Sequence, residues 1–276
     1  MGNENRSTGH ERQVLSTLMK PKPHSRIHST NRLGAVLLSM WLWSVIVSLT
    51  VVFSTLIILV TGPFWLIDRK RLSIHWLTTW WGRSILACHP GWKITVTGRH
   101  HIHPWRAYIF VANHQSLADI ILLFSLRRQF KWVAKSSLFG VPFLGWSMWL
   151  AGYIPLVRED RGSIRETYAK AKAYLSQDVP VFFFPEGTRS HTGHLGAFKN
   201  GAFKLSMQTG APIIPIVVTG TQEVLRRGSW LFRGTARLGV AVLPAVDPNA
   251  FQAEEPDGLR NHVKQLIQER LDSTPP

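Results

Sequence analysis

Residues 33–67 contain no charged side chain, and their centre, GAVLLSMWLWSVIVSLTVVFSTLIILVTG, is apolar with scattered Ser, Thr and Gly. The run exceeds the roughly 20 residues that a helix needs to cross a bilayer. It shows no polar stripe, as a core helix of a soluble protein normally would, and no small-residue cleavage site follows it, as after a signal peptide. We therefore predict a retained membrane anchor, with a buried core helix as the alternative.

The form of this anchor is left open by the sequence. It could be one tilted span, or a helical hairpin that is broken near Gly62 and Pro63 and stays in one leaflet. Basic residues stand on both sides of the run, so the positive-inside rule does not orient it. We expect residues 31–88 to form the anchoring segment. Four tryptophans near basic residues resemble an interfacial belt, or else belong to a soluble core: Trp65, Trp76, Trp80 and Trp81.

The chain is strongly basic, with 32 Lys+Arg against 16 Asp+Glu and a formal net charge of +16. Such a charge attracts nucleic acid, an anionic membrane surface or phosphorylated substrates. The basic residues are spread along the chain without a recognised reading motif, so we expect membrane lipids as partners and no nucleic acid. Residues 1–30 are polar and basic, which is typical of a disordered tail. The single cysteine, Cys88, excludes an internal disulfide and a cysteine-ligated metal cluster.

After residue 90, short apolar runs alternate with longer helical stretches, as in an α/β domain. Runs that are apolar on both faces fit a sheet covered by helices. Ser163 and Glu166 have the spacing of a capping box at the start of a helix, and apolar residues at helical spacing predict a closing helix near residues 259–271. We predict a mixed, mostly parallel sheet of about seven strands at residues 93–98, 107–112, 131–135, 153–157, 179–184, 212–218 and 236–243.

The stretch FVANHQSLAD, residues 110–119, places Asp119 five residues after His114. Inside one regular helix these side chains would lie about 140° apart and could not meet. They can pair if the strand and loop end at His114 and a helix begins near Ser116, with Asp119 in its first turn. Asp119 would then fix the imidazole tautomer and leave the other ring nitrogen free to accept a proton. The alternative is an ordinary strand-to-helix turn, which Asn, Ser and Asp also suit.

Two further stretches pass from an apolar strand into a polar turn: FFFPEGTRS, residues 182–190, and GYIPLVRED, residues 152–160. Polar clusters that each follow a strand can gather along one edge of a sheet, where α/β folds commonly bind ligands. Arg158 and Arg189 could clamp a phosphate bidentately, and Thr188 adds a hydroxyl. Taken singly, each arginine could equally be a solvated surface group.

These blocks resemble those of a known family. NHQSLAD is similar to the N-H-x-x-x-x-D signature of the glycerolipid acyltransferases, and FPEGTRS is similar to a second block of that family. GYIPLVRED and APIIPIVVTG, residues 211–220, resemble two more blocks, in the family's order. The resemblance covers roughly residues 90–245. It departs from the commoner pattern at Leu156 and Val157, where polar or aromatic residues often occur, and this weakens the assignment of the acceptor more than that of the reaction.

The resemblance implies an acyltransferase domain over residues 89–276. It implies transfer of a fatty acyl group from acyl-CoA or acyl-acyl carrier protein to the free sn-2 hydroxyl of lysophosphatidic acid, giving phosphatidic acid, with no cofactor, metal or protein nucleophile. His114 would be the general base and Asp119 would orient it. The enzyme would be a membrane protein, and in a bacterium the domain would lie on the cytoplasmic side of the inner membrane, where the thioester donors are. Another lysolipid or lipid-like acceptor remains the alternative.

The positions that match the family's acceptor-binding blocks are Arg158, Glu186, Gly187 and Arg189. The arginines would hold the phosphate, and Gly187 would permit close backbone approach. We expect Glu186 to orient an arginine or the glycerol hydroxyl. Lys135 matches a basic position before the second block, either as a phosphate contact or as a solvated lysine. A serine hydrolase with Ser116 beside His114 is a rival reading, but the chain lacks the G-x-S-x-G motif.

Overall fold

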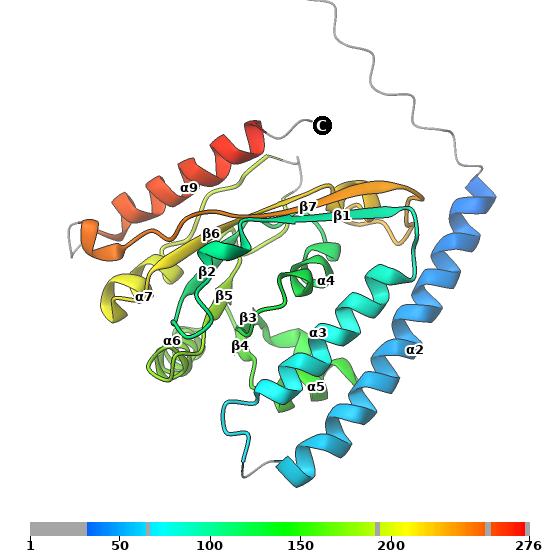
Figure 1. Ribbon diagram of the computed structural model, residues 1–276, viewed down its shortest axis with the longest axis horizontal. Coiled ribbons are helices and arrows are strands. Elements are labelled where there is room, and N and C mark those ends of the chain that lie inside the picture. Colours follow the sequence, from blue (N-terminus) through cyan, green and yellow to red (C-terminus); the bar gives the residue numbers. More distant parts are fainter. Residues whose placement is uncertain (1–31, 65–66, 191–193, 252–254, 274–276) are drawn as a thin grey trace, which may run out of the picture.

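The computed structural model describes residues 32–64, 67–190, 194–251 and 255–273. The predicted tail, residues 1–30, and Trp65 therefore lie outside the described residues. Helix α2, Arg32–Phe64, is followed by helix α3, Leu72–Ala87. The two helices pack side by side (Figure 1). They form a helical hairpin, and α2 continues through Gly62 and Pro63 to Phe64, so the chain is not broken at these two residues.

Within the described ranges, α2 is the one helix that is long and apolar enough to cross a membrane. Its apolar window has a mean hydropathy of 2.5, and only 17% of that window is buried inside the protein. A core helix of a soluble domain would be mostly buried, so α2 has the character of a membrane anchor. Trp76 and Trp80 on α3 are exposed, whereas Trp81 is half-buried and donates a hydrogen bond from Nε1 to Oγ1 of Thr50 on α2.

The predicted sheet is confirmed. Its seven strands lie in the order β1-β7-β6-β2-β5-β3-β4. Every neighbouring pair is parallel except β6 and β7, which are antiparallel. The strands are β1 (Trp92–Thr97), β2 (Ile109–Ala112), β3 (Lys131–Lys135), β4 (Ile154–Leu156), β5 (Val181–Phe183), β6 (Ile213–Thr219) and β7 (Ala236–Val242).

Helices cover both faces of this sheet (Figure 1). One face carries α6 (Arg161–Leu175), α7 (Gly201–Thr209) and α9 (Pro256–Asp272), and the other carries α3, α4 (Ala118–Leu123) and α5 (Leu144–Leu150), with α2 outside them. The central strand β2 is buried along its whole length, which explains why its sequence is apolar on both faces. The shorter elements are η1 (Arg99–His101), η2 (Phe124–Leu126), η3 (Ser136–Gly140), α8 (Thr221–Val224) and η4 (Pro248–Ala250).

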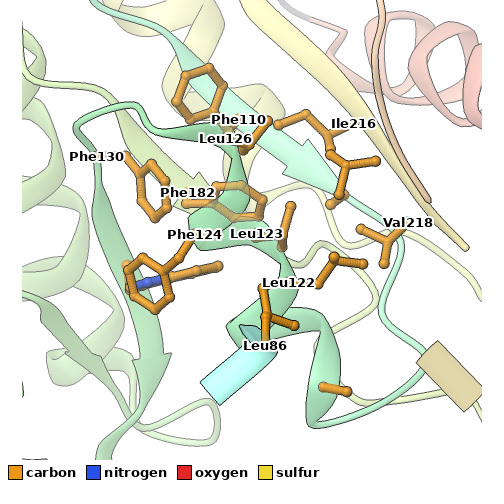
Figure 2. Close-up of a cluster of buried hydrophobic side chains, with 14 of the residues drawn as sticks. Leu86, Phe110, Leu122, Leu123, Phe124, Leu126, Phe130, Phe182, Ile216 and Val218 are labelled. Carbon is orange, nitrogen blue, oxygen red and sulfur yellow. The ribbon is translucent and has the colours of Figure 1, made fainter. Parts of the chain in front are cut away.

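The core beneath α4 fixes the position of the turn that precedes it. Phe110 of β2 and Phe182 of β5 both pack against Phe130, and Leu122 and Leu123 of α4 are completely buried in the same cluster (Figure 2). Burial of each such side chain stabilises the fold by about 1.5–3 kcal/mol. The first turn of α4 is thereby held against the sheet next to the end of β2.

One predicted detail of α6 is wrong. The helix begins at Arg161 and its N-cap is Asp160, whose carboxylate accepts a hydrogen bond from the amide of Gly162. Ser163 lies inside the first turn, and its hydroxyl accepts a hydrogen bond from the amide of Val157. The serine is therefore bonded to the turn after β4 and does not cap the helix. The predicted closing helix is present as α9, with its apolar stripe buried.

Candidate active site

His114 and Asp119 meet as the spacing predicted. Nδ1 of His114 lies 2.7 Å from Oδ2 of Asp119. His114 follows the end of β2, and Asp119 lies in the first turn of α4, so the strand-to-helix turn brings the two together. Asp119 is completely buried, and the His114 side chain is 14% exposed. Because a carboxylate only accepts hydrogen bonds, Nδ1 must carry the proton, which leaves Nε2 as the proton acceptor.

The same carboxylate oxygen also folds the turn. Oδ2 of Asp119 accepts hydrogen bonds from the amides of Gln115 at 2.6 Å and Ser116 at 2.9 Å. Asn113 fixes the start of the turn, because its side-chain amide bonds both the carbonyl and the amide of Val218 on the neighbouring strand β6. The imidazole thus sits on a turn that is anchored at both ends.

The plane of the imidazole is set by an aromatic contact. The ring of His114 stacks on Phe184, with 4.0 Å between centroids and 17° between planes, and Phe184 in turn stacks on Trp132. Phe184 directly follows β5, which lies next to β2 in the sheet. The sequence does not single out this phenylalanine, because an aromatic residue at the end of an apolar strand does not reveal which ring it will contact.

The carboxylate of Glu186 bonds two backbone amides. Its Oε1 accepts a hydrogen bond from the backbone amide of His114 at 2.8 Å, and its Oε2 accepts one from the amide of Gly196 at 2.9 Å. The side chain is buried, and burial raises the pKa of Glu186 above its usual range, against the opposing effect of these two hydrogen bonds. Each oxygen therefore accepts a hydrogen bond from a backbone amide, and Glu186 holds the turn that carries His114. Its predicted role toward an arginine or the acceptor's hydroxyl stays a prediction.

The other predicted residues gather along the edge at which β2, β5, β3 and β4 end. A single cavity of about 810 Å³ opens there, and its lining includes His114, Lys135, Arg158, Gly187, Thr188 and Arg189. Gly187 has a φ of 72°, a left-handed conformation that favours glycine, in the turn after β5. The structure thus brings all the predicted polar clusters to one cavity, because β5 and β3 lie between β2 and β4.

Two cations in this cavity were not predicted. Lys199 lies just before α7, and Arg227 follows α8, in the connection between β6 and β7. Neither belongs to a motif, and only the tertiary fold brings them to the cavity. The rest of the lining is mostly apolar and includes Trp43, Ile46 and Phe53 of α2. The anchor helix therefore forms part of the wall of the cavity.

Ser116 is poorly placed to act as a nucleophile. Its Oγ donates a hydrogen bond to the carbonyl of Leu225 at 2.6 Å and accepts one from the amide of Ala118 at 3.2 Å, and the residue is completely buried. These contacts are those of a structural hydroxyl. Across the described ranges, no cluster of three or more His, Cys, Asp and Glu side chains could hold a metal ion.

Comparison with known proteins is consistent with this arrangement. A family model described as Acyltransferase matches residues 93–219. A 1-acyl-sn-glycerol-3-phosphate acyltransferase of Chlamydomonas reinhardtii is 33% identical over 230 residues, which cover 83% of this chain and 68% of the relative. A chloroplastic enzyme of the same name from Arabidopsis thaliana is 30% identical over 255 residues, covering 91% of this chain and 68% of the relative.

A solved structure has the same fold. The crystal structure of the 1-acyl-sn-glycerophosphate acyltransferase PlsC from Thermotoga maritima matches with a TM-score of 0.75 and 26% identity, covering 89% of this chain and 99% of that one. The fold, the family model and the two relatives agree. The chain is an acyltransferase and belongs to the family of the 1-acyl-sn-glycerol-3-phosphate acyltransferases.

Proposed function

We propose that this acyltransferase moves a fatty acyl group from acyl-CoA or acyl-acyl carrier protein to the free sn-2 hydroxyl of lysophosphatidic acid, giving phosphatidic acid. The observation that carries the proposal is the bonded pair of His114 and Asp119 beside a cavity whose lining combines cationic side chains with many apolar ones. An acceptor with a phosphate, a hydroxyl and an acyl chain offers a matching partner for each part. The names of the relatives point to the same acceptor.

In this mechanism, Nε2 of His114 takes the proton of the acceptor hydroxyl as its oxygen attacks the thioester carbonyl. Asp119 holds the ring through Nδ1 and stabilises the imidazolium that forms. The tetrahedral intermediate then collapses, the carbon–sulfur bond breaks, and the departing thiolate takes the proton from Nε2. The ester forms as the thioester is lost, so the protein needs no covalent intermediate of its own.

The phosphate of the acceptor would lie among the cations at the ends of β3, β4 and β5. In lysophosphatidic acid, the phosphate is attached to the carbon next to the one that bears the reacting hydroxyl, so it must lie close to His114. Arg158 and Arg189 can each offer paired N–H donors to phosphate oxygens, with Thr188 as a further donor. Lys135, which is exposed at the end of β3, can add a point charge.

The fatty chains would occupy the apolar part of the cavity. A cavity of about 810 Å³ lies within the range of sites that enclose small-molecule ligands. Because α2 lines it, a lipid in the bilayer could enter beside the anchor. We propose a membrane location for the protein, and in a bacterium a catalytic domain on the cytoplasmic side of the inner membrane.

The test is acyl transfer by the purified protein in detergent, with one labelled thioester and a panel of lysophosphatidic acid, lysophosphatidylcholine and monoacylglycerol. We expect product from lysophosphatidic acid and little from the others. Arg158→Gln should raise KM for lysophosphatidic acid about tenfold or more through the loss of a charge-assisted contact. The matched control is Arg165→Gln, an exposed arginine of α6 outside the cavity lining. Efficient transfer to another lysolipid instead would reassign the acceptor, and equal effects of the two substitutions would remove the phosphate role of Arg158.

A further inference from the structure

A second group of cations lies outside the active-site cavity. It consists of four arginines that are not among the residues lining the cavity, Arg83, Arg99, Arg127 and Arg128, which we call the arginine cluster. Burial and the charges of the other three arginines lower the pKa of the Arg99 guanidinium. Burial and the charge of Arg127 lower the pKa of Arg83 as well. Such repulsion is largely screened beyond about 10 Å, so these side chains lie close together.

Contacts with η2 fix the position of the cluster. Nη2 of Arg99 donates a hydrogen bond to the carbonyl of Ser125 at 2.6 Å, which places this guanidinium against η2. Arg127 and Arg128 directly follow η2. Nε2 of His75 on α3 donates to the carbonyl of Arg128 at 3.0 Å. These bonds hold η1, η2 and α3 together around the cluster.

Arg83 reaches the cluster from α3. The residue before it, Gly82, lies so close to η2 that a Cβ atom there would approach Cδ2 of Phe124 to 2.6 Å. The guanidinium carbon of Arg83 lies 5.8 Å from the ring centre of Trp80, one turn earlier on α3. Trp80 is 59% exposed. The surface of the anchor hairpin therefore carries an exposed indole beside the cluster.

The cluster lies at the edge of the sheet opposite to the cavity. β1 is parallel to β7, β7 is antiparallel to β6, and β6 is parallel to β2, so β1 runs opposite to β2. Arg99 follows the end of β1, and Arg128 comes shortly before β3, which runs in the same direction as β2. Both therefore lie at the edge where β2 and β3 begin. Lys135 and Arg158 of the cavity lie where β3 and β4 end, so a ligand of the cluster is distinct from the acceptor's phosphate.

No acidic side chain neutralises these charges. Within the described ranges, none of the four arginines forms an ion pair. Nε of Arg99, Nε of Arg128 and the hydroxyl of Ser125 are buried and have no hydrogen-bond partner in the same ranges. The protein thus holds like charges together without supplying a counter-charge, which costs free energy. A bound anion would remove this repulsion, and the guanidinium group matches phosphate especially well.

The neighbouring surface indicates which phosphate this is. Trp76 and Trp80 are exposed on α3, which packs against the apolar helix α2, and tryptophan favours the headgroup layer of a bilayer. Each Lys or Arg near a bilayer adds attraction to anionic lipid. We propose that the arginine cluster binds the phosphate of an anionic phospholipid at the membrane surface beside the anchor hairpin, outside the active site. This inference rests on the proposed membrane location and on neither substrate of the reaction.

The experiment measures thermal unfolding of the purified protein in detergent micelles that contain phosphatidylglycerol or phosphatidylcholine with the same acyl chains. The variants are Arg127→Gln, whose side chain is exposed, and the double variant Arg83→Gln/Arg127→Gln. The charge-matched control is Arg161→Gln/Arg165→Gln, at two exposed positions of α6 on the other face of the sheet. Arg158→Gln reports on lipid bound in the cavity, and sodium phosphate without lipid reports on a free anion.

In the wild type, the α6 control and Arg158→Gln, phosphatidylglycerol should raise the unfolding temperature above that in phosphatidylcholine by about 2–4 °C. Arg127→Gln should lose part of this rise, and the double variant should lose nearly all of it. In phosphatidylcholine, both cluster variants should unfold no lower than the wild type, because removing one of several like charges relieves their repulsion.

Equal unfolding temperatures of the wild type in the two lipids, or a rise that the double variant keeps, would overturn the inference. A rise lost only in Arg158→Gln would place the lipid in the cavity, and a rise reproduced by sodium phosphate would assign the cluster to a free anion. Cluster variants that unfold at lower temperature in phosphatidylcholine would show that the arginines are structural. A raised KM for acyl-acyl carrier protein but not for acyl-CoA, without an effect of phosphatidylglycerol, would assign the cluster to an acidic protein. Because unfolding does not depend on turnover, failure of the proposed reaction leaves this test unaffected.

Discussion

Asp119→Asn separates the proposed catalytic role of the Asp119 charge from the structural role of its carboxylate. In the structure, Oδ2 accepts three hydrogen bonds, from Nδ1 of His114 and from the amides of Gln115 and Ser116. Its other oxygen, Oδ1, is buried and has no hydrogen-bond partner among the described residues. Asparagine can place its carbonyl oxygen at Oδ2 and its amino group at Oδ1. The variant should therefore keep all three hydrogen bonds and lose only the negative charge.

The expected loss follows from electrostatics. Two unit charges about 4 Å apart attract each other by roughly 4 kcal/mol at an effective dielectric constant near 20. That attraction exists only when the imidazolium has formed, so losing it raises the barrier by about this amount and lowers kcat roughly a thousandfold. The assay compares kcat at saturating substrates and the unfolding temperature in the same detergent for the wild type, Asp119→Asn and Asp119→Ala.

Asp119→Asn should unfold within a few degrees of the wild type. Asp119→Ala should unfold at a clearly lower temperature, because it leaves buried amides without acceptors at about 1–3 kcal/mol each. Retention of a third or more of the wild-type kcat by a stably folded Asp119→Asn would refute the reasoning, because the charge would then contribute nothing to the chemical step.

Three other predictions follow from buried contacts. Glu186→Gln offers one oxygen to two backbone amides, so it should destabilise the protein by about 1–3 kcal/mol and lower kcat by shifting His114. The control Glu166→Gln, at an exposed position, should change neither the unfolding temperature nor kcat. Identical behaviour of the two variants would contradict this prediction. Ser116→Ala should lower the unfolding temperature but keep kcat within a few-fold, whereas abolished transfer by a folded variant would support a nucleophilic serine. Burial lowers the pKa of Lys131 to about 7, with a further contribution from Arg71 that Asp68 opposes, so the unfolded chain binds more protons between about pH 7 and pH 10. The free energy of unfolding should therefore rise with pH across this window, by at most about 1.4 kcal/mol per pH unit. Lys131→Met should flatten this dependence on pH. Urea unfolding of both proteins at several pH values measures the two profiles, and parallel profiles for the wild type and Lys131→Met would refute the assignment.

The parts of the fold that depend on local sequence were predictable. Each of the seven strands lies within two residues of its predicted limits, because apolar runs bounded by turn residues leave few alternatives. The pairing of His114 with Asp119 was predictable for a similar reason: only a turn between the two residues allows contact. The first residue of α6 was not predictable in this way, because Asp160 and Ser163 are both good capping residues. The amide of Val157 decided between them by bonding to the serine.

The contacts that depend on the order of the strands could not be read from the sequence. Glu186 bonds the amide of His114 across 72 residues, and nothing local shows that a carboxylate after a strand will accept a backbone hydrogen bond so far away. Lys199 and Arg227 reach the cavity only because β5 and β6 lie on the two sides of β2. The resemblance to the acyltransferases supplied the motif residues and could not supply these two.

The most direct test of the central claim is the single-turnover rate of acyl transfer to lysophosphatidic acid for the wild type and His114→Ala, with thermal unfolding of both proteins measured alongside. If His114 takes the proton of the acceptor hydroxyl, the variant should fold, bind both substrates and lose about 10²–10⁴ of the rate. A folded His114→Ala that transfers the acyl group at a rate near that of the wild type would contradict the assignment of His114 as the general base.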